Sequence, residues 1–213
     1  MDLHTKVNNS KIRRDEIGNQ NLWLERGSLR IVLLSTFTAL SVVSGYLLAS
    51  LPNIEIFTMM IFLSGFILGK RDGFIIGIMS GFIFCFFNPY GASALPLLTV
   101  QLLYYSLVGL IGASIRGVLR TKTFFKPDDD LYVFPILFIF GSIGALMTFS
   151  FDIISSFVDS IWIFGNINAF WLYYASGLAF TTIHLIANTL VFIFLLPVLI
   201  QLIYRLLDIP KDY

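Results

Sequence analysis

One stretch, residues 52–91, decides the fold of this chain: PNIEIFTMMIFLSGFILGKRDGFIIGIMSGFIFCFFNPYG. Two apolar runs in it share a series of glycines at every fourth position: Gly65, Gly69, Gly73, Gly77 and Gly81. Residues four apart lie on one face of a helix, and small residues let membrane helices approach closely. The stretch therefore predicts a tightly packed transmembrane hairpin, with helices over about 54–69 and 74–87 and a polar KRDG turn at 70–73.

The composition is that of an integral membrane protein. Of the 213 residues, 57% are hydrophobic and 13% are charged, and the mean hydropathy is +0.84. Soluble domains carry about 25% charged residues. The length leaves room for about six spans of about 20 to 25 residues with short loops, and for no separate soluble domain. The polar first 22 residues lack the apolar core of a cleavable signal peptide, so we expect none.

We expect a basic cytoplasmic arm over 1–30, an all-α transmembrane domain of six helices over 31–205 and a cytoplasmic tail over 206–213. The two hairpin helices are shorter than the hydrocarbon core of about 30 Å. An aromatic, weakly polar excursion on the outer side is expected over 152–170. The predicted spans cover residues 31–50, 54–69, 74–87, 96–118, 131–151 and 171–203.

The positions of the cations predict the orientation. With six spans and the amino terminus inside, all 14 Lys and Arg residues fall on the cytoplasmic side and the outer loops hold none. Because the Lys and Arg bias sets membrane topology, we expect both termini in the cytoplasm of a multi-pass protein in a prokaryotic plasma membrane. The basic arm is expected to contact the lipid of the inner membrane surface.

This orientation gathers carboxylates, amides and aromatic rings at the outer ends of the helices, as in a site open to the exterior. Gln101 and Tyr105 lie four residues apart on one helix face, as do His184 and Asn188. Solvated loops, helix caps and an interfacial aromatic belt are the alternatives, and Asn188 is expected to hydrogen-bond between helices. The candidate substrate-binding residues are Asn53, Glu55, Asn88, Tyr90, Gln101, Tyr105, Asp152, Trp162 and His184.

Few residues suit other chemistry. The single Cys85 excludes an internal disulfide and cysteine-based zinc sites, and the second histidine, His4, falls in the inner arm. Ser93 with His184 is the one weak serine–histidine pair, but Ser93 falls in a loop. No nucleotide-binding motif occurs. We therefore expect no cofactor, no metal, no nucleic-acid partner and no enzymatic activity.

Several segments together resemble the substrate-binding S components of energy-coupling-factor (ECF) vitamin transporters. They are PNIE at 52–55, the spaced glycines, FNPYG at 87–91, and His184 and Asn188 before LLP at 195–197. The resemblance covers about residues 31–205 and implies a six-helix unit with both ends cytoplasmic that captures a micronutrient from outside. It also implies three partners, a transmembrane coupling subunit and two ATPase subunits, which would hydrolyse the ATP.

The resemblance also implies a docking surface. The family docks through an Ala-x-x-x-Ala stripe on its first helix, and the matching positions here are Ser35 and Ala39. Both are small, so a partner helix can still approach closely. Ordinary packing within the bundle is the alternative.

The charges narrow the expected cargo. The expected outer side carries three carboxylates, Glu55, Asp152 and Asp159, and no Lys or Arg. It therefore lacks the cationic side chains that proteins use to bind carboxylates or phosphates, so a neutral or cationic vitamin or precursor fits better. A flavin, thiamine, a pyridoxine-like ring, a deazapurine base and a corrinoid all suit amides and aromatic rings, and the hairpin favours a corrinoid. Two other functions stay open: a membrane scaffold of the rod-shape-determining type, with a similar glycine-rich hairpin, and an intramembrane enzyme.

Overall fold

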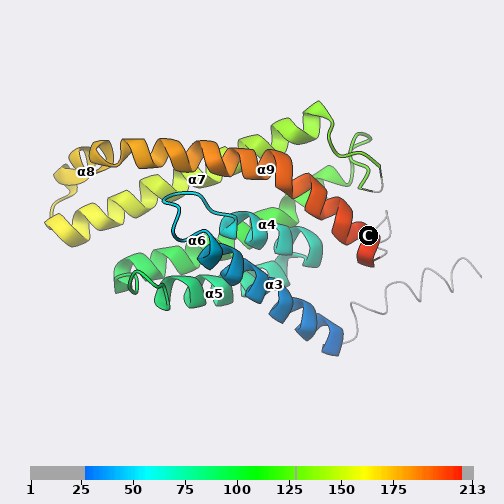
Figure 1. The fold of residues 1–213 in the computed structure, drawn as a ribbon, viewed down its shortest axis with the longest axis horizontal. Coiled ribbons are helices and arrows are strands. Elements are labelled where there is room, and N and C mark those ends of the chain that lie inside the picture. Colours follow the sequence, from blue (N-terminus) through cyan, green and yellow to red (C-terminus); the bar gives the residue numbers. More distant parts are fainter. Residues whose placement is uncertain (1–26, 128, 208–213) are drawn as a thin grey trace, which may run out of the picture.

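The computed structural model describes residues 27–127 and 129–207, which form helices joined by short loops, with no strand in these ranges (Figure 1). The all-helical prediction is confirmed for this part of the chain. Most of the predicted arm, with His4, and the tail from residue 208 lie outside the described residues. The elements are α3 (Gly27–Leu47), α4 (Phe57–Leu68), α5 (Lys70–Phe86), α6 (Leu95–Leu119), α7 (Phe134–Phe164), η1 (Ile167–Ala169), α8 (Phe170–Ser176) and α9 (Leu178–Leu207).

Four of the described helices, α3, α6, α7 and α9, are long and apolar enough to cross a membrane. The chain is thus compatible with a multi-pass membrane protein. Helix α4 has 12 residues and α5 has 17, which at 1.5 Å per residue correspond to about 18 and about 26 Å. Both fall short of a hydrocarbon core of about 30 Å, so the count of six spans stays a prediction. Successive long helices run in alternating directions along the bundle (Figure 1).

The hairpin turns at a single residue. Helix α4 ends at Leu68 and α5 begins at Lys70, so Gly69 alone joins them, with φ +97° and ψ 179°. A glycine adopts this conformation at little cost because it has no Cβ. The predicted turn at 70–73 is therefore wrong: these residues form the first turn of α5, where the negative charge of Asp72 suits the positive end of the helix dipole.

The glycines of the hairpin pack against α6 as well as against each other. A Cβ on Gly65 would lie 1.9 Å from the carbonyl oxygen of Gly109, and one on Gly77 would lie 2.3 Å from that of Tyr105. A Cβ on Gly73 would lie 2.5 Å from the Cα of Gly65. Three helix backbones therefore meet here. The hairpin prediction was incomplete, because Gly109 and Gly112 of α6 belong to the same contact. Their spacing in the sequence could have indicated this.

Helix α4 is the centre of the molecule. Eleven of its twelve residues are buried, and two of its phenylalanines carry ring contacts to the second half of the chain. Phe62 meets Phe192 of α9 edge-on at 5.4 Å, and Phe66 meets Phe140 of α7 edge-on at 6.2 Å between ring centroids. Surrounding helices thus enclose α4, which explains how so short an apolar helix fits in the bundle.

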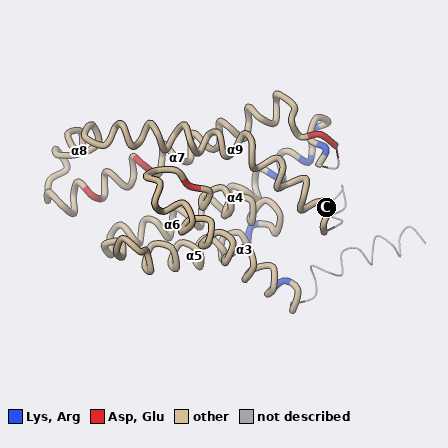
Figure 2. Tube along the Cα trace, viewed as in Figure 1, with Lys and Arg blue, Asp and Glu red and all other residues tan. Residues whose placement is uncertain are grey.

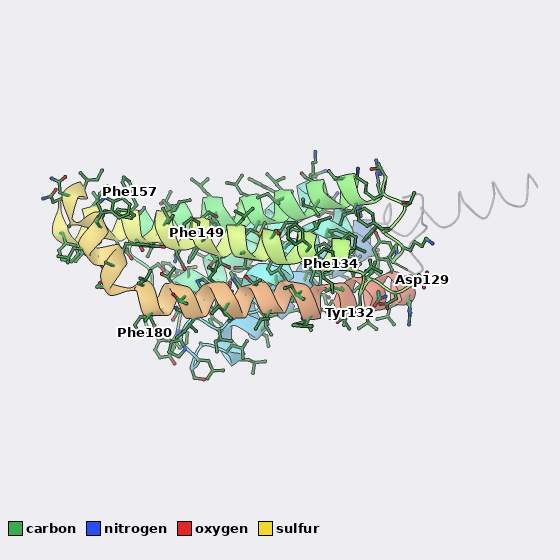
Figure 3. The ribbon with its side chains drawn as sticks, turned by 90° about the horizontal axis from the view of Figure 1, so that it is seen from above. Asp129, Tyr132, Phe134, Phe149, Phe157 and Phe180 are labelled. Carbon is green, nitrogen blue, oxygen red and sulfur yellow. The ribbon has the colours of Figure 1, made fainter. Side chains whose placement is uncertain are left out.

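The second half of the chain differs most from the prediction. Helix α7 continues through the predicted excursion at 152–170 as far as Phe164, because no Gly or Pro interrupts residues 152–164. It ends at Gly165, whose left-handed φ of +62° is a common way to terminate a helix. The predicted span at 171–203 begins later, at Leu178, because Gly177 separates the short α8 from α9. Helices α7 and α9 lie side by side and join through α8 at one end of the bundle (Figures 1 and 3).

Candidate functional site

A cavity of about 340 Å³ lies where the loop 48–56 meets α5, α6, α7 and α9. The loop supplies nearly half of the lining, and the rest comes from the ends of α3 and α5, the first turns of α6, and the facing sides of α7 and α9. Seven of the residues that the sequence nominated line this cavity: Asn53, Glu55, Asn88, Tyr90, Gln101, Tyr105 and His184.

The cations lie at one end of the bundle, and the cavity lies away from that end. Lys and Arg gather where α3 and α5 begin and where α6 and α9 end, whereas acidic positions of α7 and the loop before α4 lie nearer the other end (Figure 2). At the basic end, the Arg30 Nε donates to both Asp72 carboxylate oxygens, at 3.0 and 2.9 Å. Among the described residues that line the cavity there is no Lys or Arg.

Glu55 contacts two helices beside the cavity, α4 and α9. Its Oε2 accepts a hydrogen bond from the backbone N–H of Thr58 at 3.0 Å, which satisfies one free donor at the start of α4. Its Oε1 accepts from Asn188 Nδ2 at 3.1 Å and lies 3.7 Å from His184 Nε2. These contacts compensate the carboxylate for its burial, because each replaces a hydrogen bond or a favourable charge interaction that water would provide. Glu55 is therefore a carboxylate whose two oxygens are both engaged by the protein.

His184 lies between two carboxylates from different parts of the chain. Its Nδ1 is 2.8 Å from Asp152 Oδ1 on α7, and its Nε2 faces Glu55. One imidazole can balance at most one of these negative charges. When both carboxylates are ionised, the group of Glu55, Asp152 and His184, called here the acidic cluster, therefore carries a net negative charge whichever form the ring takes.

Asn188 connects the acidic cluster to the bundle. Besides Glu55, its Nδ2 donates to Thr148 Oγ1 at 2.8 Å, so Asn188 links α9 to α7 and to the loop before α4. This agrees with the interhelical role predicted for Asn188. Sequence reasoning missed Thr148, although it lies four residues before Asp152 on α7 and so on the same helix face.

Three buried oxygens in and behind the cavity wall have no hydrogen-bond partner within the described part of the chain. They are Gln101 Oε1, Asp152 Oδ2 and Asn188 Oδ1. A buried polar atom without a partner is costly, and most such atoms in proteins are satisfied. Gln101 itself lines the cavity. Of the three, only Gln101 is therefore placed to supply an acceptor to a bound molecule that brings a donor.

Aromatic rings form one part of the wall, beside aliphatic residues of the loop 48–56. Tyr105 meets Phe57 edge-on at 4.8 Å and lies 5.9 Å from Phe151, whose ring is 6.2 Å from that of His184. Phe57 also stacks on Phe84 at 4.4 Å between centroids. Phe84 and Phe151 line the cavity but were not predicted, because nothing distinguishes them from the other phenylalanines in the sequence. The wall is thus suited to contact a planar ring.

The other nominated residues lie elsewhere. Asp152 stands behind His184 and is not part of the lining. Trp162 is 61% exposed near the end of α7, where an interfacial aromatic residue would lie. Ser35 and Ala39 are both exposed on α3 and so are not used for packing within the bundle.

Metal and serine chemistry find little support. No group of three or more His, Cys, Asp or Glu side chains within residues 27–127 and 129–207 could hold a metal ion. Ser93 is not among the residues that line the cavity, and the His184 nitrogens face carboxylates.

Comparison with known proteins gives no relative: no family model, no curated protein and no solved structure matches this chain.

Proposed function

We propose that this protein is the substrate-binding membrane subunit of an ECF-type ATP-driven importer, which captures a small neutral or cationic water-soluble vitamin or precursor. The observation that carries the proposal is the cavity of about 340 Å³ lined by seven residues nominated from the sequence. Concave sites with a few polar groups among aromatic rings are the usual form of small-molecule sites.

The proposed orientation places this cavity on the outside. Its lining comes from the ends of α3 and α5 and the beginnings of α6 and α9, opposite the ends that carry Lys and Arg. By the positive-inside tendency the basic end faces the cytoplasm. In this arrangement α4 and α5 complete six spans, and the short length of α4 is tolerated because protein surrounds it.

The cavity volume bears on the cargo. Pockets for small molecules range over about 300 to 1,000 Å³, so this one is near the lower limit. It suits a molecule of one or two rings better than a corrinoid, which the sequence pattern favoured.

The energy for transport would come from partners, a transmembrane coupling subunit and two ATPases. The exposed small residues Ser35 and Ala39 on α3 are the proposed contact with the coupling subunit. The protein itself would bind its substrate without ATP and catalyse no reaction.

A calorimetric screen of the purified protein against the water-soluble vitamins tests the proposal. We expect one member to bind saturably without ATP. Binding by no member, in a preparation that elutes as a single folded species, would reject the importer.

A scaffold of the rod-shape-determining type is the second candidate. The backbone contacts among α4, α5 and α6 favour it, because such a rigid unit would serve a scaffold equally well. The same screen separates the two, since a scaffold has no need to bind a vitamin.

A further inference from the structure

We infer that the cavity selects a small aromatic cation that donates an N–H hydrogen bond to Gln101, in preference to neutral or anionic molecules of the same size. The inference rests on the proposed function and names the substrate class of the same site. Three features carry it: the net charge of the acidic cluster, the unpartnered oxygen of Gln101 and the aromatic wall.

The acidic cluster gives the charge preference. Glu55 and Asp152 lie on either side of one imidazole, and the lining holds no Lys or Arg to balance the second carboxylate. The side chains of Glu55, Asp152 and His184 are 19%, 13% and 10% exposed, so water screens their charges poorly. A cation bound beside His184 would balance the remaining negative charge, whereas an anion would be repelled by it.

Gln101 gives the donor preference. Its carbonyl oxygen is buried without a partner among the described residues, and Gln101 is one of the residues of α6 that line the cavity. A substrate N–H would satisfy this oxygen. A substrate that presents only acceptors there would leave it unsatisfied, and such mismatches discriminate strongly between otherwise similar ligands.

The rings of Tyr105 and Phe151, 5.9 Å apart, line the cavity next to His184. The negative face of an aromatic ring attracts a cation, and a planar substrate can also stack there. The wall therefore reinforces the charge preference.

Glu55 has a different task from Gln101. Both of its oxygens already accept hydrogen bonds from the protein, one at the start of α4 and one from Asn188. It is thus a positioning residue that fixes His184 and the start of α4, while Gln101 is the proposed substrate contact.

The first test compares probes on the wild-type protein by titration calorimetry at pH 7. The cations thiamine and pyridoxamine carry N–H donors, pyridoxine is the neutral congener of pyridoxamine, and biotin, pantothenate and nicotinate are anions. We expect a cation to bind most tightly, by about tenfold or more, with no anion binding. An anion or pyridoxine as the tightest ligand would overturn the inference but leave the importer standing. If none of the six probes binds, the inference fails, and the importer is then decided by the full vitamin screen described above.

The second test changes the protein. Asp152→Asn keeps an oxygen for His184 but removes the charge, so it should weaken the bound cation about tenfold and change pyridoxine affinity less than threefold. Equal losses for both probes would show that Asp152 has only a structural role and would overturn the charge preference.

Gln101→Met keeps the size of the side chain but removes the acceptor, and should weaken an N–H-donating probe about tenfold. An unchanged affinity would overturn the contact. Should either variant elute as aggregate, the wild-type comparison of pyridoxamine with pyridoxine still decides the charge preference.

Discussion

The contact between Gly109 and Gly73 predicts a large effect of one methyl group. In Gly109→Ala the new Cβ would lie 2.1 Å from the Gly73 carbonyl oxygen and 2.4 Å from its carbon, whereas ordinary contact begins at 3.4 Å. Helices α5 and α6 would have to separate by about 1.3 Å, because backbone atoms cannot rotate away as a side chain does.

The expected cost follows from two opposing effects. Overpacking costs typically 1–3 kcal/mol, and a backbone clash belongs at about 3 kcal/mol. Replacing a helical glycine by alanine returns about 1 kcal/mol, which leaves a net loss of about 2 kcal/mol. For a protein of this size that corresponds to a fall of about 4 to 8 °C in the melting temperature.

Scanning fluorimetry of the purified variants in detergent measures this directly. Gly117→Ala on the same helix is the matched control, because nothing lies within 4 Å of its added Cβ. We expect that control to melt at or above the wild-type temperature. Equal melting temperatures for Gly109→Ala and Gly117→Ala would refute the backbone contact among α4, α5 and α6.

Three further predictions address the ion pair, the orientation and the docking surface. Arg30→Ala leaves the buried Asp72 carboxylate without its guanidinium, so it should melt below the double variant that also carries Asp72→Ala; the reverse order would contradict a structural ion pair. In a background without the native cysteine, Asn168→Cys should react with a membrane-impermeant maleimide on intact cells, and Lys122→Cys only after lysis; the opposite pattern would invert the proposed topology. Ala39→Leu should abolish ATP-driven uptake while substrate binding persists, since Ala39 is exposed, and loss of binding instead would assign Ala39 to bundle packing.

The helix boundaries show where sequence patterns suffice and where they do not. Residues 95–119 end in basic residues and start beside Pro96, so the helix there could be predicted nearly to the residue. The end of α7 could not, because the span was predicted to end at about 151, before a weakly polar excursion that starts at Asp152. In the structure Asp152 lies within α7, and His184, far along the chain, supplies its partner. Such a partner cannot be recognised from a local pattern.

The candidate site was predictable where polar residues stand out in an apolar chain. Glu55, Gln101 and His184 are conspicuous for that reason, and all three line one cavity. The full role of Glu55 was not predictable, since its engagement by Asn188 depends on how α9 packs beside the start of α4. Phe84 and Phe151 were equally hidden, because in a sequence with 22 phenylalanines only the fold decides which ring faces the cavity.

The central claim is that the cavity beside Gln101 binds a small molecule, and a calorimetric stoichiometry tests it most directly. The tightest vitamin of the screen should bind the wild-type protein at one site per chain, and Gln101→Met should lose about tenfold in affinity. The matched control is Gln201→Met. The wild-type Gln201 side chain donates to the Asp129 carbonyl at the basic end, so this variant should bind like the wild type. Equal affinities of all three proteins would contradict substrate binding in this cavity.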